Sequence, residues 1–278
     1  MANALSVSAG VNAGFRLLRP AWRAAPAGLA IAAAGAFASE VMTTHGAAWW
    51  MLGVMVSAAT GVVGAGAVYR LALAAQGIEP PGGGLGPGGV QWRGLEWRLV
   101  QATLLYYLVL GAAAAVAAGV LAAAAYGLLG AASLHSARAL GEAAGRRLGV
   151  AAGLALALVF FGVLLCWLSL RLVLLRAIAA AEAKLSLNRA LAATRGQVWT
   201  ILGTLVVLAL PTVGIGFVAG FLRGVLSLAG PGAPAILVYE LVIAVGSAFY
   251  QIPASLGFAA YAYERLVSDR PSVVRVFD

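Results

Sequence analysis

The chain has 278 residues, of which 63% are hydrophobic and only 10% are charged, and its formal net charge is +9. Soluble domains are about half apolar and about a quarter charged, so this composition excludes a water-soluble globular fold. The basic residues stand beside apolar stretches, which favours contact with lipid headgroups and argues against binding to nucleic acid.

The N-terminal region combines a predicted surface helix with a predicted membrane span. Within residues 1–19, apolar side chains recur at helical spacing at Val7, Val11, Phe15 and Leu18. This pattern predicts an amphipathic helix that lies in the membrane interface. An Ala-rich span is expected over residues 24–41. A cleavable secretory signal is the alternative, because a basic segment, an apolar stretch and Ala36-Phe37-Ala38 follow one another here.

Further apolar runs follow, each long enough for the roughly 20-residue helix that crosses about 30 Å of hydrocarbon. They cover residues 47–68, 99–129, 148–170, 199–222 and 236–261. With the first span they predict an all-α fold, a polytopic membrane helix bundle of about six transmembrane helices with interfacial amphipathic helices. Residues 1–278 are expected to form a single membrane domain.

The connections between these runs carry their own signals. Pro and Gly dominate residues 77–89, which predicts a flexible loop. The segment Trp92–Arg98 alternates aromatic and basic residues and is interpreted as a short interfacial helix. Another surface helix is expected within Leu172–Arg195, with Gly196 as its stop signal. Residues 264–278 form a predicted tail.

The basic residues also predict an orientation, because Lys and Arg near span ends prefer the cytoplasm. With six spans, one side of the membrane receives fourteen of the 18 basic residues. These are Arg16, Arg19, Arg23, Arg70, Arg93, Arg98, Arg171, Arg176, Lys184, Arg189, Arg195, Arg265, Arg270 and Arg275. Both termini are therefore expected on the cytoplasmic side. The preference for Arg over Lys, with abundant Ala and Gly, is typical of a GC-rich bacterial genome and favours a bacterial inner membrane.

Polar residues inside apolar spans are the candidates for a functional site, because burying a charge in the bilayer is costly. Glu240 near the start of the last span and Arg223 near the end of the preceding one are expected to form an ion pair. Pro211 and Pro253 interrupt the same two spans, and Gln251 could add polar lining to a site there. Packing without a substrate is the alternative interpretation.

A second group of candidates is expected to contact lipid, most strongly anionic lipid on the cytoplasmic face. These residues are Arg16, Arg19, Arg93, Arg98, Lys184, Arg189 and Arg195. Enzymatic signals are weak: the chain has one cysteine, Cys166, and two histidines, His45 and His135, and contains no metal-binding or nucleophile motif. No catalytic residue and no cofactor is predicted.

The segment after the fourth span resembles a pattern in a broad bacterial family of six-helix inner-membrane proteins. That family includes the membrane domain of some glycerophosphodiester phosphodiesterases and stand-alone relatives of uncharacterised function. The resemblance rests on Arg171-Leu172-Val173-Leu174, Ala181-Glu182, Leu185-Ser186-Leu187, Arg189-Ala190-Leu191, Thr194-Arg195-Gly196, Trp199 and Ile201-Leu202-Gly203. It implies the same membrane fold and no catalytic chemistry, since no hydrolytic residues are present to carry over.

These observations favour a non-enzymatic, organising or accessory membrane protein that contacts lipid or partner helices through its Arg-rich surface. The alternative is a small transporter or channel that uses Glu240, Arg223 and the Pro-broken helices. Protein partners and oligomeric state are not predicted by any pattern in the chain.

Overall fold

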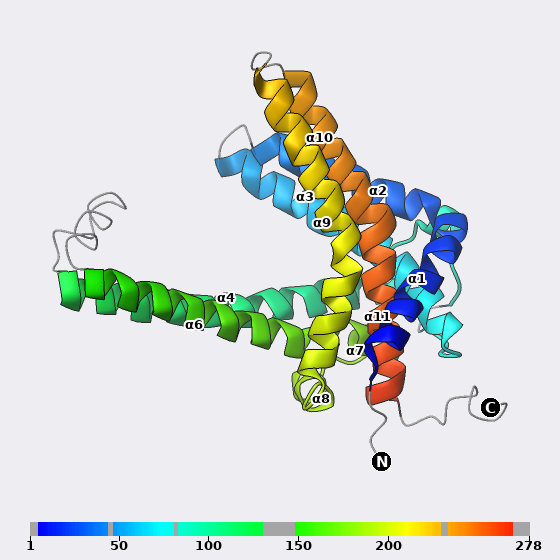
Figure 1. The fold of residues 1–278 in the computed structure, drawn as a ribbon. Coiled ribbons are helices and arrows are strands. Elements are labelled where there is room, and N and C mark those ends of the chain that lie inside the picture. The colour runs from blue at the N-terminus through cyan, green and yellow to red at the C-terminus, as the bar shows by residue number, and fades with distance from the viewer. Residues whose placement is uncertain (1–4, 44–46, 81–82, 130–147, 229–232, 269–278) are drawn as a thin grey trace. The chain divides into compact units, whose positions relative to one another are not determined.

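The computed structural model describes residues 5–43, 47–80, 83–129, 148–228 and 233–268. These residues form helices and no strand, which confirms the all-α prediction (Figure 1). The longer helices are α1 (Val7–Ala24), α2 (Pro26–Thr43), α3 (Ala47–Ala75), α4 (Gly94–Leu129), α6 (Leu148–Leu172), α9 (Val198–Leu228), α10 (Ala233–Gly246) and α11 (Ile252–Leu266). The short elements are η1 (Pro87–Gly89), α7 (Leu175–Glu182), α8 (Leu187–Ala193) and the π-helical turn η3 (Ser247–Gln251).

Within the described residues, 5 helical stretches are long and apolar enough to cross a membrane. They are Ala48–Ala75, Pro87–Ala124, Ala155–Glu182, Val198–Phe221 and Leu237–Leu266. A sixth span exists if α1 and α2 count together, although these two helices meet at an angle of 99°. Pro26 begins α2, where a missing N–H costs no hydrogen bond, so the chain turns without disrupting either helix.

The chain divides into two compact units, one of residues 1–103 and 173–278 and one of residues 104–172. In the smaller unit, the Tyr106 hydroxyl lies 2.5 Å from Ser169 Oγ and joins α4 to α6. Apolar side chains of this unit stay exposed, among them Val116, Leu156 and Phe160. Because lipid tails solvate such side chains, exposure of this kind suits membrane helices.

In the larger unit, α2 packs along α3 through small residues. A Cβ at Gly35 would overlap Thr60, and one at Gly64 would come within 2.9 Å of the Ala32 Cβ. Close backbone approach of this kind drives helix association in lipid, where the hydrophobic effect between helices is absent. Small residues thus form the packing surface between α2 and α3.

Helix α1 packs closely against α11 (Figure 1) and also contacts α9. A Cβ at Gly14 would lie 2.7 Å from the Ala254 carbonyl oxygen, and one at Gly257 would lie 3.0 Å from the Ala13 carbonyl oxygen. The buried face of α1 consists of Gly10, Gly14, Leu17 and Ala21. None of the four residues of the apolar stripe found in the sequence belongs to this buried face: Val7 and Phe15 are exposed, and Val11 and Leu18 are half-buried.

Two connections differ from their sequence-based prediction. The expected interfacial helix around residues 92–98 is instead the beginning of α4, which continues without a break from Gly94. The expected single helix after the fourth span is two, because Ala183 adopts a left-handed conformation (φ 59°) and ends α7 before α8 begins. The tail beyond residue 268 and the segment with His135 lie outside the described residues.

Candidate functional site

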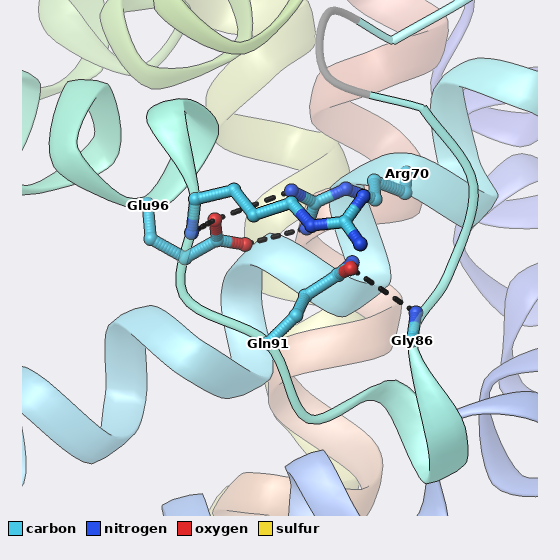
Figure 2. A network of polar contacts seen from close by, with 5 residues as sticks. Arg70, Gly86, Gln91 and Glu96 are labelled. Atoms are coloured by element: carbon cyan, nitrogen blue, oxygen red, sulfur yellow. Dashed lines mark hydrogen bonds and ion pairs between the residues drawn. The ribbon is translucent and has the colours of Figure 1, made fainter.

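An ion pair between Arg70 and Glu96 is buried in the larger unit (Figure 2). Arg70 Nη1 lies 2.5 Å from Glu96 Oε1 and Nη2 lies 3.2 Å from Oε2, so the contact is bidentate. The two side chains are 1% and 0% exposed. Arg70 belongs to α3 and Glu96 to the first turn of α4, so the pair fastens two helices across the Gly/Pro-rich connection.

Local structure explains how Glu96 reaches this position. The backbone N–H of Arg93 donates to Glu96 Oε2 over 2.7 Å, in the manner of a capping box at the start of α4. Gly66 on α3 leaves room for the carboxylate, because a Cβ there would lie 2.5 Å from Glu96 Oε1. A buried carboxylate with an Arg partner and a backbone donor has its charge compensated, as burial requires.

Residues 86–91, the end of the Gly/Pro-rich connection, lie beside this pair and against α2 (Figure 2). Gln91 Oε1 accepts a hydrogen bond from the Gly86 N–H over 3.1 Å (Figure 2). Gly88 and Gly89 have positive φ angles of 60° and 79°, and a Cβ on Gly89 would lie 2.7 Å from the Ala25 Cβ. Arg70 Nε and Gln91 Nε2 are buried donors that have no hydrogen-bond acceptor in the part of the chain that the structure describes.

The break between α10 and α11 is the second polar site. In a regular helix the Phe249 carbonyl would accept from the N–H of residue 253, but Pro253 has none. The Trp22 indole Nε1 donates to this carbonyl over 2.5 Å. The π-helical turn η3 directly precedes Pro253, so two features that kink helices lie together at this break.

Gln251, a candidate from the sequence for a polar site at the Pro-interrupted spans, lies in this turn. Its side chain is hydrogen-bonded to a neighbouring helix. Its Oε1 accepts a hydrogen bond from Thr212 Oγ1 on α9 over 2.9 Å. The neighbouring Tyr250 hydroxyl donates to the Leu208 carbonyl over 2.9 Å. These contacts join α9 to the broken helix.

Glu240 is half-buried in α10, and the side chain of Arg223 lies outside the described residues, so their ion pair stays a prediction.

A third polar cluster holds α7 and α8 to the end of α11. Arg189 Nη1 lies 2.6 Å from Glu182 Oε2, and the Tyr263 hydroxyl donates to Glu182 Oε1 over 2.9 Å. Arg189 Nη2 also donates to the Val267 carbonyl over 3.1 Å. Arg189, a candidate lipid contact, therefore has a structural partner in Glu182.

A cationic pocket with a volume of about 400 Å³ lies among α1, α3 and α11. Its polar side chains come from Asn12, Arg16, Gln76, Tyr261 and Arg265. The guanidinium of Arg265 stacks 5.6 Å from the Tyr261 ring centre. Arg16 belongs to the predicted lipid-contacting group, whereas nothing in the sequence alone singled out Gln76 or Tyr261.

No protein-family model matches the chain, and neither the curated proteins nor the solved structures include a match to it. Fold and composition therefore carry the assignment. The chain is a multipass helical membrane protein. No group of three or more His, Cys, Asp or Glu that could hold a metal ion occurs among the residues the structure describes.

The other predicted lipid contacts of this membrane protein are distributed over the larger unit. Arg19 on α1, Lys184 between α7 and α8, and Arg195 before α9 are exposed. Arg93 is exposed and Arg98 half-buried near the start of α4. Sequence reasoning missed the Arg70–Glu96 pair, although an acidic residue beside an apolar span is itself a signal that a partner exists.

Proposed function

We propose that the protein is a non-enzymatic, organising component of a bacterial inner membrane, with both termini cytoplasmic, and that it contacts anionic lipid through an Arg-rich surface. One observation carries this proposal. The carboxylates of Glu96 and Glu182 are bound by Arg70 and Arg189, and only 0% and 18% of these carboxylate side chains is exposed. Their negative charge is therefore turned inward.

Cations remain outside to face the headgroups. Arg19, Arg23, Lys184 and Arg195 are exposed in the larger unit, on α1 and around α8. Each basic side chain near an anionic membrane surface contributes about 1 kcal/mol of attraction, and the effect falls off within a Debye length. A surface of this kind attracts anionic lipid without needing a catalytic centre or a cofactor.

The resemblance to the six-helix bacterial membrane family fits the same proposal. Residues that carry it have structural tasks here: Glu182 and Arg189 form the ion pair, Thr194 Oγ1 donates to the Ala190 carbonyl, and Gly196 adopts a positive φ of 79°. A pattern that builds the α7 to α9 connection would recur in membrane proteins of different function. Membership of that family is part of the proposal.

The transporter alternative has less support. Gln251 and Thr212 are hydrogen-bonded to each other, and the polar group freed by Pro253 is bound by Trp22. A small core of Ala32, Ala33 and Ala248, with Phe249 and Ile252 packed against it, lies next to this helix break. These contacts favour a packing role for the broken helix.

The lipid proposal is tested by reconstituting the purified protein into vesicles of mixed zwitterionic and anionic lipid and quantifying the lipids that copurify after mild solubilisation. Replacing Arg19, Lys184 and Arg195 with Gln should lower the anionic preference about fivefold per charge at low ionic strength. The charge-preserving variants Arg19→Lys and Arg195→Lys should keep it. Unchanged enrichment in the triple Gln variant would overturn the proposal.

The orientation is tested separately by cysteine labelling. Cys166 is exposed and is first replaced with Ser. Single cysteines are then introduced as Lys184→Cys and Arg195→Cys and treated with a membrane-impermeant maleimide. Labelling that occurs only after the inner membrane is opened supports a cytoplasmic surface, and labelling of intact spheroplasts contradicts it.

A further inference from the structure

The cationic pocket lies at the depth where two candidate spans end. Helix α3 ends at Ala75, directly before Gln76, and Arg265 is in the last turn of α11, which ends at Leu266. The spans Ala48–Ala75 and Leu237–Leu266 finish at the same points. In a membrane protein, span ends lie at the level of the lipid headgroups.

The lining combines charge with neutral polar groups. Among the described residues that line the pocket there are two arginines, Arg16 and Arg265, and no acidic side chain. Asn12 and Gln76 supply amides, and Tyr261 supplies a hydroxyl. Guanidinium groups bind phosphate oxygens through charge-assisted hydrogen bonds, whereas amides and a phenol suit the hydroxyls of a polyol.

The Arg265 guanidinium is held beside Tyr261 and has an N–H donor that is not used within the described residues. Its guanidinium stacks on the Tyr261 ring, and its Nε is buried and makes no hydrogen bond to any described residue. The carboxylate of Glu264 lies 3.5 Å from that Nε and balances part of the charge. The carbonyls at the ends of α3 and α11 are also partly negative, so an anion in the pocket would depend on the second arginine, Arg16.

One side of the pocket is formed by a close crossing of two helices. Gly257 lines it and forms the close crossing with α1, where an added Cβ would lie 3.1 Å from the Leu17 Cβ and 3.2 Å from the Gly14 Cα. Ala13 and Leu17 on α1 supply apolar lining beside it. A preformed site binds with a smaller entropic penalty than one that must be ordered by its ligand.

We propose that this pocket binds the phosphoglycerol headgroup of an anionic membrane lipid. Arg16 and Arg265 hold the phosphate, and Asn12, Gln76 and Tyr261 contact the glycerol hydroxyls. The volume of about 400 Å³ lies within the range of small-molecule pockets and exceeds what a bare phosphate fills. The inference rests on the proposed lipid-contacting function and adds selectivity for one headgroup to it.

The test compares Arg16→Gln with Arg19→Gln, because both side chains are exposed on α1 but only Arg16 lines the pocket. Protein in nanodiscs of zwitterionic lipid is exchanged against vesicles that contain phosphatidylglycerol or phosphatidic acid, and bound lipid is counted by native mass spectrometry. Arg16→Gln should lower phosphatidylglycerol retention about tenfold, as expected for a lost hydrogen bond between charged groups. Arg19→Gln should lower retention of both lipids equally, by no more than about fivefold, as expected for one surface charge.

A second variant separates the glycerol from the phosphate. Gln76→Ala should reduce retention of phosphatidylglycerol and leave phosphatidic acid unchanged, since the latter has no headgroup hydroxyls. Gln76 follows the end of α3, so this substitution leaves the helix intact, and unchanged thermal unfolding verifies the fold of each variant. Equal loss of both lipids in Gln76→Ala would contradict the assignment of the hydroxyl contacts.

Other outcomes overturn the pocket in distinguishable ways. Equal losses of retained lipid in Arg16→Gln and Arg19→Gln would contradict the pocket proposal, whereas the proposed general attraction to anionic lipid would still hold. No loss in either, together with an unchanged triple variant of Arg19, Lys184 and Arg195, would remove both proposals. If soluble glycerol 3-phosphate binds the detergent-solubilised protein in an Arg16-dependent way and phosphatidylglycerol does not, the occupant is a soluble phosphate ester and the lipid assignment is wrong.

Discussion

The carboxylate of Glu96 occupies the space that a side chain at Gly66 would need: a Cβ on Gly66 would lie 2.5 Å from Glu96 Oε1. A glycine on α3 thus faces the charged residue in the first turn of α4. Their juxtaposition lets Arg70, one helical turn further along α3, close the ion pair. Three residues in two helices are therefore coupled, and each can be tested by itself.

Replacing Gly66 with Ala should destabilise the protein by about 1 to 3 kcal/mol, because the added methyl overpacks the space held by Glu96. Gly61 on the same helix is a matched control, since a Cβ there meets nothing within 4 Å. Gly61→Ala should be neutral or slightly stabilising, as Ala favours helix by up to about 1 kcal/mol. Thermal unfolding in detergent, followed by tryptophan fluorescence, measures both. Equal stability of the two variants would contradict the packing argument.

Breaking the buried ion pair should have a larger effect. Glu96→Gln leaves the Arg70 guanidinium buried without its counter-charge, and loss of one partner of a buried pair costs about 3 to 5 kcal/mol. Glu79 is an exposed acid in the preceding loop, so Glu79→Gln serves as the control and should be neutral. The double variant Arg70→Met with Glu96→Leu should recover much of the loss, because it removes both charges at once. Failure of the double variant to recover stability would show that Glu96 acts through contacts other than Arg70.

The bond from Trp22 to the Phe249 carbonyl gives a prediction about the broken helix. Trp22→Phe removes the indole donor and should cost about 0.5 to 1.5 kcal/mol, the net contribution of a typical hydrogen bond, because this bond is exposed. Pro253→Ala supplies the missing backbone N–H, so the same Trp22→Phe change should cost less in that background. A double-mutant cycle on unfolding free energies measures this coupling. Additive effects would mean that the indole contributes through its volume and not through the hydrogen bond.

Composition was enough to predict the helical membrane fold, because apolar length and charge spacing are properties of single segments. The polar contacts were not predictable in this way. Arg70 and Glu96 are separated by 26 positions and Trp22 and Phe249 by 227, and no periodic pattern relates residues across such distances. Pro253 was identified from the sequence as a helix interruption, but the residue that binds the freed carbonyl could come from any neighbouring helix.

The packing face of helix α1 was also not predictable from the hydrophobic pattern of the sequence. Its apolar stripe of Val7, Val11, Phe15 and Leu18 is visible in the sequence, but in the structure Val7 and Phe15 are exposed and Val11 and Leu18 are only half-buried. Its packed face depends on Gly10 and Gly14, which add almost nothing to a hydrophobic pattern. In lipid, small residues mark the contact face and large apolar residues are as stable outside as inside. A hydrophobic periodicity therefore locates the lipid-facing side of such a helix more readily than its packing side.

The Glu182 cluster yields the last prediction, which separates structural from lipid-binding arginines. Glu182→Gln should weaken the Arg189 contact and expose α8 (Leu187–Ala193) and the end of α11 to faster amide exchange. Arg189 is 43% exposed, so solvent screening limits the cost in global stability to about 1 kcal/mol or less. Hydrogen–deuterium exchange with mass spectrometry measures the local change, with Lys184→Gln as a control that should leave exchange unaltered. Glu182→Gln removes a negative charge and no cation, so it should not reduce anionic lipid retention. Arg195→Gln removes a cation and should reduce it. Reduced retention in Glu182→Gln would mean that the fold of α7 and α8, and not surface charge alone, creates the lipid contact.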